Sequence, residues 1–203
     1  MQRYTEGKQR APSGGDTNDT EPRRNVEIKA RVDDLAAVQA DIEALAGPTV
    51  ARLQQVDTFF VCPHGRLKLR TFSTGQGQLI YYERPDDCGA KMSHYRLCET
   101  DRPQALCAIL AAALGVRGTV TKERLLYLYG NTRIHLDRVW DLGAFLELEV
   151  VLGPLEDEHA GRSTAEALLT ALKIERCQLV DRAYIDLLEK AASEPSPPAA
   201  SVG

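Results

Sequence analysis

Apolar and polar residues alternate along much of this chain, and the alternation predicts a protein built mainly of β-strands. Runs with a period of two occupy residues 25–32, 51–61, 66–73, 78–84, 91–99, 118–128, 132–139 and 144–152. Turn signals separate several of these runs, and Gly130-Asn131 is typical of a tight hairpin. We therefore expect about eight strands, with several neighbours joined as antiparallel hairpins.

Stretches with a helical period interrupt the strands and predict three or four helices. The first covers 33–47, where Asp33 or Asp34 can cap the start and Gly47 ends the helix. The others cover 101–115, about 158–173, and about 181–190. Residues 1–23 and 191–203 are polar and rich in Gly, Ser or Pro, without either period. We expect these two segments to be disordered tails around one folded domain, residues 24–190.

Charged residues repeatedly occupy one face of a strand while the other face is apolar. In residues 25–32 the side chains of Glu27, Lys29 and Arg31 share a face. The same parity recurs in Arg66, Lys68 and Arg70, in Lys122 and Arg124, in Arg133, His135 and Asp137, and in Glu147 and Glu149. A solvated face of an antiparallel sheet explains any one such strand. A solvated face explains the five strands together poorly, because exposed faces normally mix charges of both signs with Ser, Thr and Gln.

A sheet closed on itself accounts for the whole pattern. The charged faces would line a lumen, and the apolar faces would point outward against the helices. Eight strands leave an interior of roughly the size of one ligand. We therefore predict an α+β fold: an eight-stranded antiparallel β-barrel, or tunnel, with a charged lumen and helices packed outside.

The predicted lumen contains more cations than anions. Its basic residues are Lys29, Arg66, Lys68, Arg70, Lys122, Arg124 and Arg133, with Arg31, Arg84 and Lys91 as further candidates. Its carboxylates are Glu27, Asp137, Glu147 and Glu149. A buried excess of positive charge needs a counter-charge, and a polyphosphate matches Arg and Lys. The paired Glu147 and Glu149 suit Mg²⁺ or Mn²⁺, hard cations that also bind phosphate oxygens.

Composition and charge limit the kinds of partner and the location that we expect for this protein. The net charge of −4 gives no reason to expect nucleic acid, since such a binder normally has a basic excess. No apolar run approaches the length of a membrane span, and residues 1–24 lack the apolar region of a secretory signal. The five cysteines are scattered and show no zinc spacing. We expect a cytoplasmic protein with reduced thiols, either a monomer or a homodimer.

Several blocks of sequence carry a more specific signal. They are NVEIK at 25–29, GRLKLR, LIYYERPD, KMSHY, VTKERLLY and RIHLDRVWDLGAFLELEV. Together they resemble the CYTH superfamily, the triphosphate tunnel metalloenzymes, over nearly all of 24–190, and look most like its class IV adenylate cyclase-like group. The family signature on the first strand is Glu-x-Glu-x-Lys, so Glu27 and Lys29 match while Asn25 replaces the first Glu.

The resemblance implies a triphosphate-bearing substrate, two divalent-metal positions and a role for each matching residue. The metal ligands would be Glu27, Asp137, Glu147 and Glu149, which with Lys29 form the catalytic set. The phosphate-binding residues would be Lys29, Arg66, Lys68, Arg70, Arg84, Lys91, Lys122, Arg124 and Arg133. Strand 78–84 leaves open whether Tyr82 and Arg84 or Glu83 face inward. Because an amide is a poorer ligand than a carboxylate, Asn25 leaves open whether the site binds one metal ion or two.

Two further residues admit alternatives. His135 shares the inward parity and could act as an acid or base, or be held by Asp137 for structure alone. Tyr184, in the last predicted helix, could close a tunnel mouth or simply pack in the core.

Three functions fit these residues. A metal-dependent triphosphatase would act on tripolyphosphate, thiamine triphosphate or ATP. A class IV adenylate cyclase would convert ATP to cyclic AMP and pyrophosphate in the same lumen. A polyphosphate- or nucleotide-binding module would use the cations without catalysis. We favour catalysis, and hydrolysis first.

Overall fold

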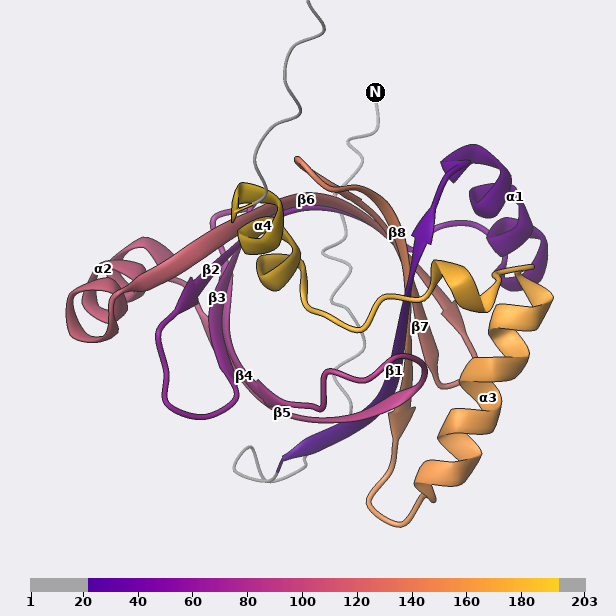
Figure 1. Cartoon of the computed structure of the whole chain (residues 1–203). Coiled ribbons are helices and arrows are strands. Elements are labelled where there is room, and N and C mark those ends of the chain that lie inside the picture. Colours follow the sequence, from indigo (N-terminus) through magenta and orange to yellow (C-terminus); the bar gives the residue numbers. More distant parts are fainter. Residues whose placement is uncertain (1–21, 194–203) are drawn as a thin grey trace, which may run out of the picture.

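A computed structural model of the chain describes residues 22–193, so most of the two predicted tails, 1–23 and 191–203, lies outside the described residues. Within 22–193, eight strands form a closed antiparallel barrel with four α-helices and a short 3₁₀ helix around it (Figure 1). The strands are β1 (Arg23–Val32), β2 (Ala51–Phe60), β3 (Arg66–Phe72), β4 (Gly77–Glu83), β5 (Lys91–Thr100), β6 (Val116–Tyr129), β7 (Thr132–Val139) and β8 (Gly143–Leu152). The helices are α1 (Leu35–Ala46), α2 (Pro103–Leu114), α3 (Glu158–Ala171), η1 (Arg176–Gln178) and α4 (Tyr184–Ser193).

The barrel combines local hairpins with pairs that join distant segments. Around its wall the order is β1-β5-β4-β3-β2-β6-β7-β8, and β8 pairs back onto β1. Strands β2 to β5 form one run of hairpins, and β6 to β8 form another. The pair β2–β6 joins the two runs directly, and β1 joins their other ends by pairing with both β5 and β8. The predicted α+β fold with an eight-stranded antiparallel barrel is confirmed.

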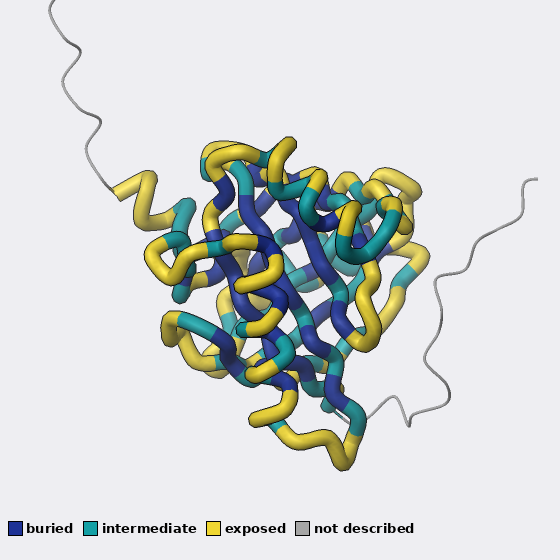
Figure 2. The backbone as a smooth tube through the Cα atoms, turned by 90° about the vertical axis from the view of Figure 1, so that its right-hand side faces the viewer, coloured by how far each residue is buried: buried dark blue, intermediate teal, exposed yellow. Residues whose placement is uncertain are grey.

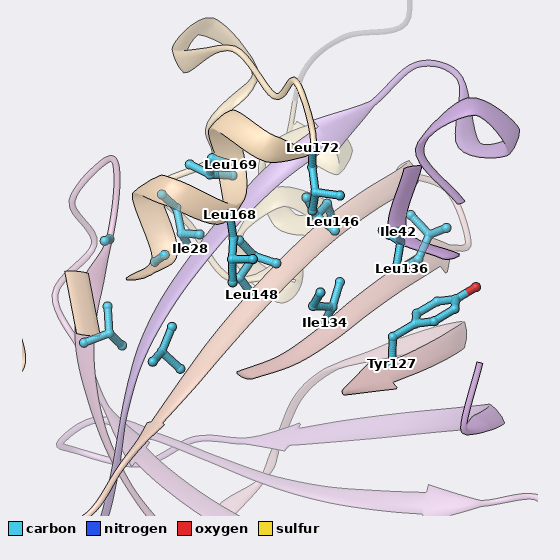
Figure 3. Packing of buried hydrophobic residues seen from close by; sticks show 14 of the residues in the cluster. Ile28, Ile42, Tyr127, Ile134, Leu136, Leu146, Leu148, Leu168, Leu169 and Leu172 are labelled. Atoms are coloured by element: carbon cyan, nitrogen blue, oxygen red, sulfur yellow. The ribbon is translucent and has the colours of Figure 1, made fainter. Parts of the chain in front are cut away.

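The main hydrophobic core lies between the outer wall of the barrel and the helices, as the parity of the strands predicts. Figure 3 shows this layer, in which side chains of β1, β7 and β8 meet those of α1 and α3. From the strands come Ile28, Ile134, Leu136, Leu146 and Leu148, and from the helices Ile42, Leu168 and Leu169. Figure 2 shows the same division, with buried residues along the strands and exposed residues on the helices and turns.

Helix α3 lies unusually close to this wall because of one glycine. A Cβ at Gly161 would lie 2.9 Å from Val26 Cγ2 and 3.0 Å from Leu152 Cδ2. Any larger residue would therefore push α3 away from β1 and β8.

The helix ends follow the predicted caps, with two differences near the C-terminus. Asp34 caps α1, since its Oδ1 accepts from the backbone N–H of Ala37 at 3.0 Å, and Gly47 ends that helix with φ +80°. The 3₁₀ helix η1 was not predicted. Helix α4 begins at Tyr184 and continues to Ser193, a few residues later than the expected 181–190 at both ends. No helix in the described part of the chain is long and apolar enough to cross a membrane.

One end of the barrel is closed by a second apolar cluster, which the sequence did not predict. Its strand residues Phe59, Val120, Val139 and Phe145 share the parity of the charged positions and therefore face inward. Residues of α4 and of the segment before it cover them, namely Val180, Ala183, Tyr184 and Ile185. The backbone N–H of Val180 donates to the carbonyl of Lys29 at 2.8 Å, which fixes this segment on β1. The charged lumen is thus limited to the rest of the barrel.

Candidate functional site

The charged face of β1 is buried at Glu27 and Lys29 and exposed at Arg31, while its apolar face is buried. Glu27 and Lys29 are 8% and 4% exposed, while Val26 and Ile28 on the opposite face are at most 1% exposed. A solvated outer face would leave the charges in water, so that interpretation is excluded for this strand. The same holds for other charged residues of predicted inward parity, which are buried at Lys122, Arg124, Asp137 and Glu147.

Glu147 lies at the centre of the charged group. In the strand register it is opposite Lys29 on β1 and His135 on β7. Its Oε2 accepts from Arg124 Nη2 at 2.7 Å, and its Oε1 lies 3.6 Å from Lys29 Nζ. Burial alone would raise the pKa of Glu147, but Lys29 and Arg124 outweigh burial and hold that pKa well below its usual range. Glu147 is therefore a buried carboxylate that stays ionised.

Glu149 continues the acidic row toward the other end of the barrel. It is opposite Glu27 on β1 and Arg133 on β7, and Arg133 Nε donates to its Oε2 at 2.9 Å. Glu27 in turn accepts from Arg84, whose side chain is 2% exposed. The side chain of Arg133 is 34% exposed, whereas that of Asp137, also on β7, is fully buried. Solvent access therefore increases along β7 toward Arg133, and we place the entrance at this end.

Asp137 is surrounded by donors. Arg124 donates to both of its oxygens at 2.6 Å, and the hydroxyl of Tyr184 donates to Oδ2 at 3.0 Å. Lys122 Nζ lies 3.6 Å from Oδ2. Asp137 is predicted to bind metal, yet both of its oxygens are engaged in orienting Arg124 in this arrangement. His135, two residues away on β7, is not among the hydrogen-bond partners of Asp137 in the described part of the chain.

A fifth carboxylate in the lumen, Asp57, was missed by the sequence analysis. It is 2% exposed and accepts from Lys68 at 3.0 Å and from Arg70 at 2.8 Å with each oxygen. Lys122 Nζ lies 3.8 Å away. Strand 51–61 carries an isolated charge on each face, Arg52 and Asp57, so it lacked the repeated parity that marked the other strands. The inward parity of Asp57 follows only from the pairing of β2 with β3, where Asp57 is opposite Arg70.

The predicted phosphate-binding residues nearest the closed end already have protein partners. Arg66 donates to Asp86 at 2.6 Å and to Asp186 of α4 at 2.9 Å. Lys91 Nζ donates to the backbone carbonyls of Asp87 at 2.7 Å and Asp181 at 2.6 Å. These contacts connect the barrel wall to the segments that cover its end.

The pairing of β4 shows which of its side chains face the lumen, a question that the sequence left open. Tyr82 is opposite Arg66 on β3, and Arg84 reaches Glu27, so Tyr82 and Arg84 face inward. Glu83 is exposed on the outside, where it accepts from Tyr81 at 2.6 Å.

Tyr184 combines the two roles considered for it. Its ring packs edge-on against Phe145 with centroids 4.9 Å apart, inside the apolar cluster that closes the barrel. The ammonium group of Lys29 lies 3.8 Å from the ring centroid on the lumen side, and the hydroxyl reaches Asp137. The residue therefore forms the floor of the charged lumen.

The lumen has a strong excess of positive charge. Nine basic residues line it in the described part of the chain: Lys29, Arg66, Lys68, Arg70, Arg84, Lys91, Lys122, Arg124 and Arg133. Five carboxylates face them: Glu27, Asp57, Asp137, Glu147 and Glu149. Burial and the charge of Arg124 lower the pKa of Lys122 to about 7. The protein alone thus neutralises the lumen incompletely.

His135 and the acidic pair form a group suited to a divalent metal. Donor atoms of His135, Glu147 and Glu149 all lie within 4.8 Å of one another. Burial, with the charge of Arg124, lowers the pKa of His135, so the imidazole is neutral near pH 7 and able to act as a ligand. Asn25 Oδ1 is also buried and has no hydrogen-bond partner among the described residues. The donor set of two carboxylates and an imidazole fits a divalent cation.

A family model independently covers this site. The CYTH domain model matches residues 23–184, which include all the lumen residues named above. The chain belongs to the CYTH domain family. A search of curated proteins found no match to the sequence.

Solved structures have the fold of this CYTH domain. The protein PH1012 of Pyrococcus horikoshii is 24% identical with a TM-score of 0.73, covering 80% of this chain and 98% of its own. A Vibrio parahaemolyticus protein described as a candidate adenylate cyclase is 20% identical with a TM-score of 0.66, covering 81% of this chain and 97% of its own. At these identities the likeness establishes the fold of the CYTH domain alone.

A cavity of about 570 Å³ lies outside the lumen of the CYTH domain, beside α4. Its lining includes the acidic residues Asp86, Asp181, Asp186 and Glu189 and the basic residues Arg117, Arg182 and Lys190. This mixed, slightly acidic lining does not suit a polyanion. The chemistry therefore points to the lumen rather than to this cavity.

Proposed function

We propose that this CYTH domain is a divalent-metal-dependent enzyme that hydrolyses a triphosphate-bearing small molecule inside the barrel. The observation that carries the proposal is the excess of nine basic over five acidic side chains lining the lumen, all of them buried or partly buried. Leaving so much like charge in a low-dielectric interior is costly, and a polyanion removes the imbalance. Tripolyphosphate, thiamine triphosphate and ATP all supply such an anion.

The basic residues would bind the phosphates from several strands at once. Arg70, Lys68 and Lys122 surround Asp57, and Arg124 lies between Asp137 and Glu147. Phosphate oxygens can accept from the N–H groups of these residues that the carboxylates leave unused. The carboxylates would keep the cations aimed at the lumen before the substrate arrives.

The acidic row would hold Mg²⁺ or Mn²⁺. Glu147 and Glu149 are the principal ligands in this proposal, with Glu27 available once Arg84 turns to a phosphate. A divalent metal held there would neutralise phosphate charge and supply an activated water for in-line attack. Because both oxygens of Asp137 are engaged by Arg124 and Tyr184, we assign Asp137 to orienting Arg124. Lys29, beside Glu147, would stabilise negative charge developing on the transferred phosphoryl group.

Product analysis tests this proposal. The full chain is incubated with tripolyphosphate, thiamine triphosphate or ATP, in Mg²⁺ or Mn²⁺, and the products are separated by ion exchange. We expect release of orthophosphate that stops in EDTA and in Glu147→Gln. The surface variant Glu166→Gln should retain the activity, because Glu166 lies on the exposed side of α3.

The alternatives give different products. Cyclic AMP with pyrophosphate from ATP would identify a cyclase and overturn hydrolysis. Binding of tripolyphosphate without turnover of any of the three compounds would leave a polyphosphate-binding module and overturn catalysis.

A further inference from the structure

The imidazole of His135 faces the two carboxylates of the acidic pair and bonds to neither. His135 is 4% exposed, and its Nδ1 lies 3.9 Å from Glu147 Oε2 and 3.7 Å from Glu149 Oε1. These separations exceed hydrogen-bond length. Nδ1 has no hydrogen-bond partner among the described residues. A buried ring nitrogen without a partner is costly, so its position needs an explanation.

The pairing of β7 with β8, and not the sequence around His135, fixes the position of the imidazole ring. His135 is directly opposite Glu147, so the barrel itself holds the ring against the acidic pair. The other candidate partner, Asp137, already accepts from Arg124 and Tyr184. A structural His–Asp pair is therefore absent at this position.

One oxygen of each carboxylate faces the imidazole: Oε2 of Glu147, which also accepts from Arg124, and Oε1 of Glu149. Arg133 binds Oε2 of Glu149, which leaves Oε1 on the side of the imidazole. The three donor atoms lie within 4.8 Å of one another, so small rotations bring them onto one ion. A further buried oxygen without a partner, Asn25 Oδ1, occupies the position where the family signature has a glutamate.

We propose that His135 is a direct nitrogen ligand of the divalent metal held by Glu147 and Glu149, and that it makes the site prefer Mn²⁺ to Mg²⁺. Imidazole binds transition-metal ions well, whereas Mg²⁺ favours an all-oxygen shell. The inference rests on the proposed function, since it concerns the metal of the same site, but it predicts binding properties that do not depend on turnover.

The test is pulsed electron paramagnetic resonance of Mn²⁺ bound to the full chain, without substrate. We expect ¹⁴N coupling from one imidazole in the wild type and its loss in His135→Gln. Titration of free Mn²⁺ should show an affinity at least about tenfold weaker in His135→Gln, since even indirect partners of a metal site contribute that much. The affinity for Mg²⁺, measured by competition, should change less than about threefold.

A matched control separates ligation from the general loss of a histidine. His94 is exposed on β5, so His94→Gln should keep both the ¹⁴N coupling and the Mn²⁺ affinity. Absence of ¹⁴N coupling in wild-type protein saturated with Mn²⁺ would overturn the proposal without relying on any variant. An unchanged ratio of Mn²⁺ to Mg²⁺ affinity in folded His135→Gln would also overturn it. Hydrolysis of tripolyphosphate with Mg²⁺ in that variant would show that the proposed function survives this failure.

Discussion

Asp57 organises more basic groups than any other single side chain that we describe in the lumen. It holds Lys68 and Arg70 by direct hydrogen bonds and lies close to Lys122. The pKa of Asp57 is held well below its usual range, because these charges outweigh burial, which alone would raise it. A residue of this kind stabilises the empty barrel and presets the cations for an anion.

Replacing Asp57 with Asn should destabilise the free protein by about 3–5 kcal/mol, because three buried cations lose their counter-charge. Tripolyphosphate should restore much of that loss, since it supplies negative charge to the same groups. Denaturant unfolding with and without tripolyphosphate measures both effects. Asp41→Asn, which removes an exposed pair with Lys173, should cost at most about 1 kcal/mol. A loss of similar size in both variants would contradict the role given to Asp57.

The buried lysines should make the free protein more stable as the pH rises from 7 to 9. The pKa of Lys122 is lowered to about 7 and that of Lys91 to about 8, in both cases mainly by burial. In the unfolded chain both pKa values return to about 10.4. Across this range the unfolded chain therefore binds more protons than the folded chain, and the free energy of unfolding increases with pH. Denaturation in EDTA at several pH values measures the slope, which should be shallower in Lys122→Met; a falling free energy of unfolding would refute the assignment.

Asn25→Glu should strengthen divalent-metal binding, with the larger gain for Mg²⁺. The change places a second carboxylate on the face of β1 that carries Glu27. Calorimetric titration with each metal in the presence of tripolyphosphate gives the affinities. Unchanged or weaker binding of both metals would place residue 25 outside the metal shell.

Among the elements, α4 depends most on charged contacts with the barrel. Asp186 accepts from Arg66 at 2.9 Å and Arg117 at 2.6 Å, and its Oδ2 accepts from the backbone N–H of Ala183 at the start of the helix. Tyr184 anchors the same turn in the closed end of the barrel. These contacts join distant parts of the chain, so no local pattern could have predicted them.

Asp186→Asn should therefore loosen α4 without unfolding the barrel. Amide hydrogen exchange should speed up in residues 184–193, while the strands keep their protection. Asp157 caps α3, because its side chain accepts from the His159 N–H. Asp157→Ala removes this cap and serves as the control that affects α3 instead. Equal exchange in α4 of wild type and Asp186→Asn would show that apolar packing alone holds this helix.

The strands show which features of the fold and the site a sequence pattern can predict. Repeated parity, as in Glu27 and Lys29 or Glu147 and Glu149, predicted both the inward face and the closed barrel. A strand with an isolated charge on each face, such as that of Arg52 and Asp57, gave no such signal. The parity also did not indicate which inward positions of each strand are charged and which are apolar. The apolar closed end forms because α4, at the end of the chain, packs against these strands.

At the scale of the whole molecule, the fold inverts the usual arrangement of a small domain. Its main apolar core lies between the barrel and the helices (Figure 3), and charged side chains line the lumen of the barrel. This arrangement leaves excess positive charge where only an anionic occupant can balance it. The binding of a polyphosphate within the lumen is therefore the central claim to test.

The most direct measurement is calorimetric titration of tripolyphosphate into wild-type protein and Lys122→Met. Lys122 is 2% exposed within the lumen, whereas Lys173 is exposed on the surface and provides the control Lys173→Met. Loss of a hydrogen bond to a charged group should weaken binding to Lys122→Met by about 1.5–3 kcal/mol, or roughly 10- to 150-fold. Lys173→Met should bind as the wild type does. Equal affinity in all three proteins, or no binding to the wild type, would contradict the assignment of the lumen as a triphosphate site.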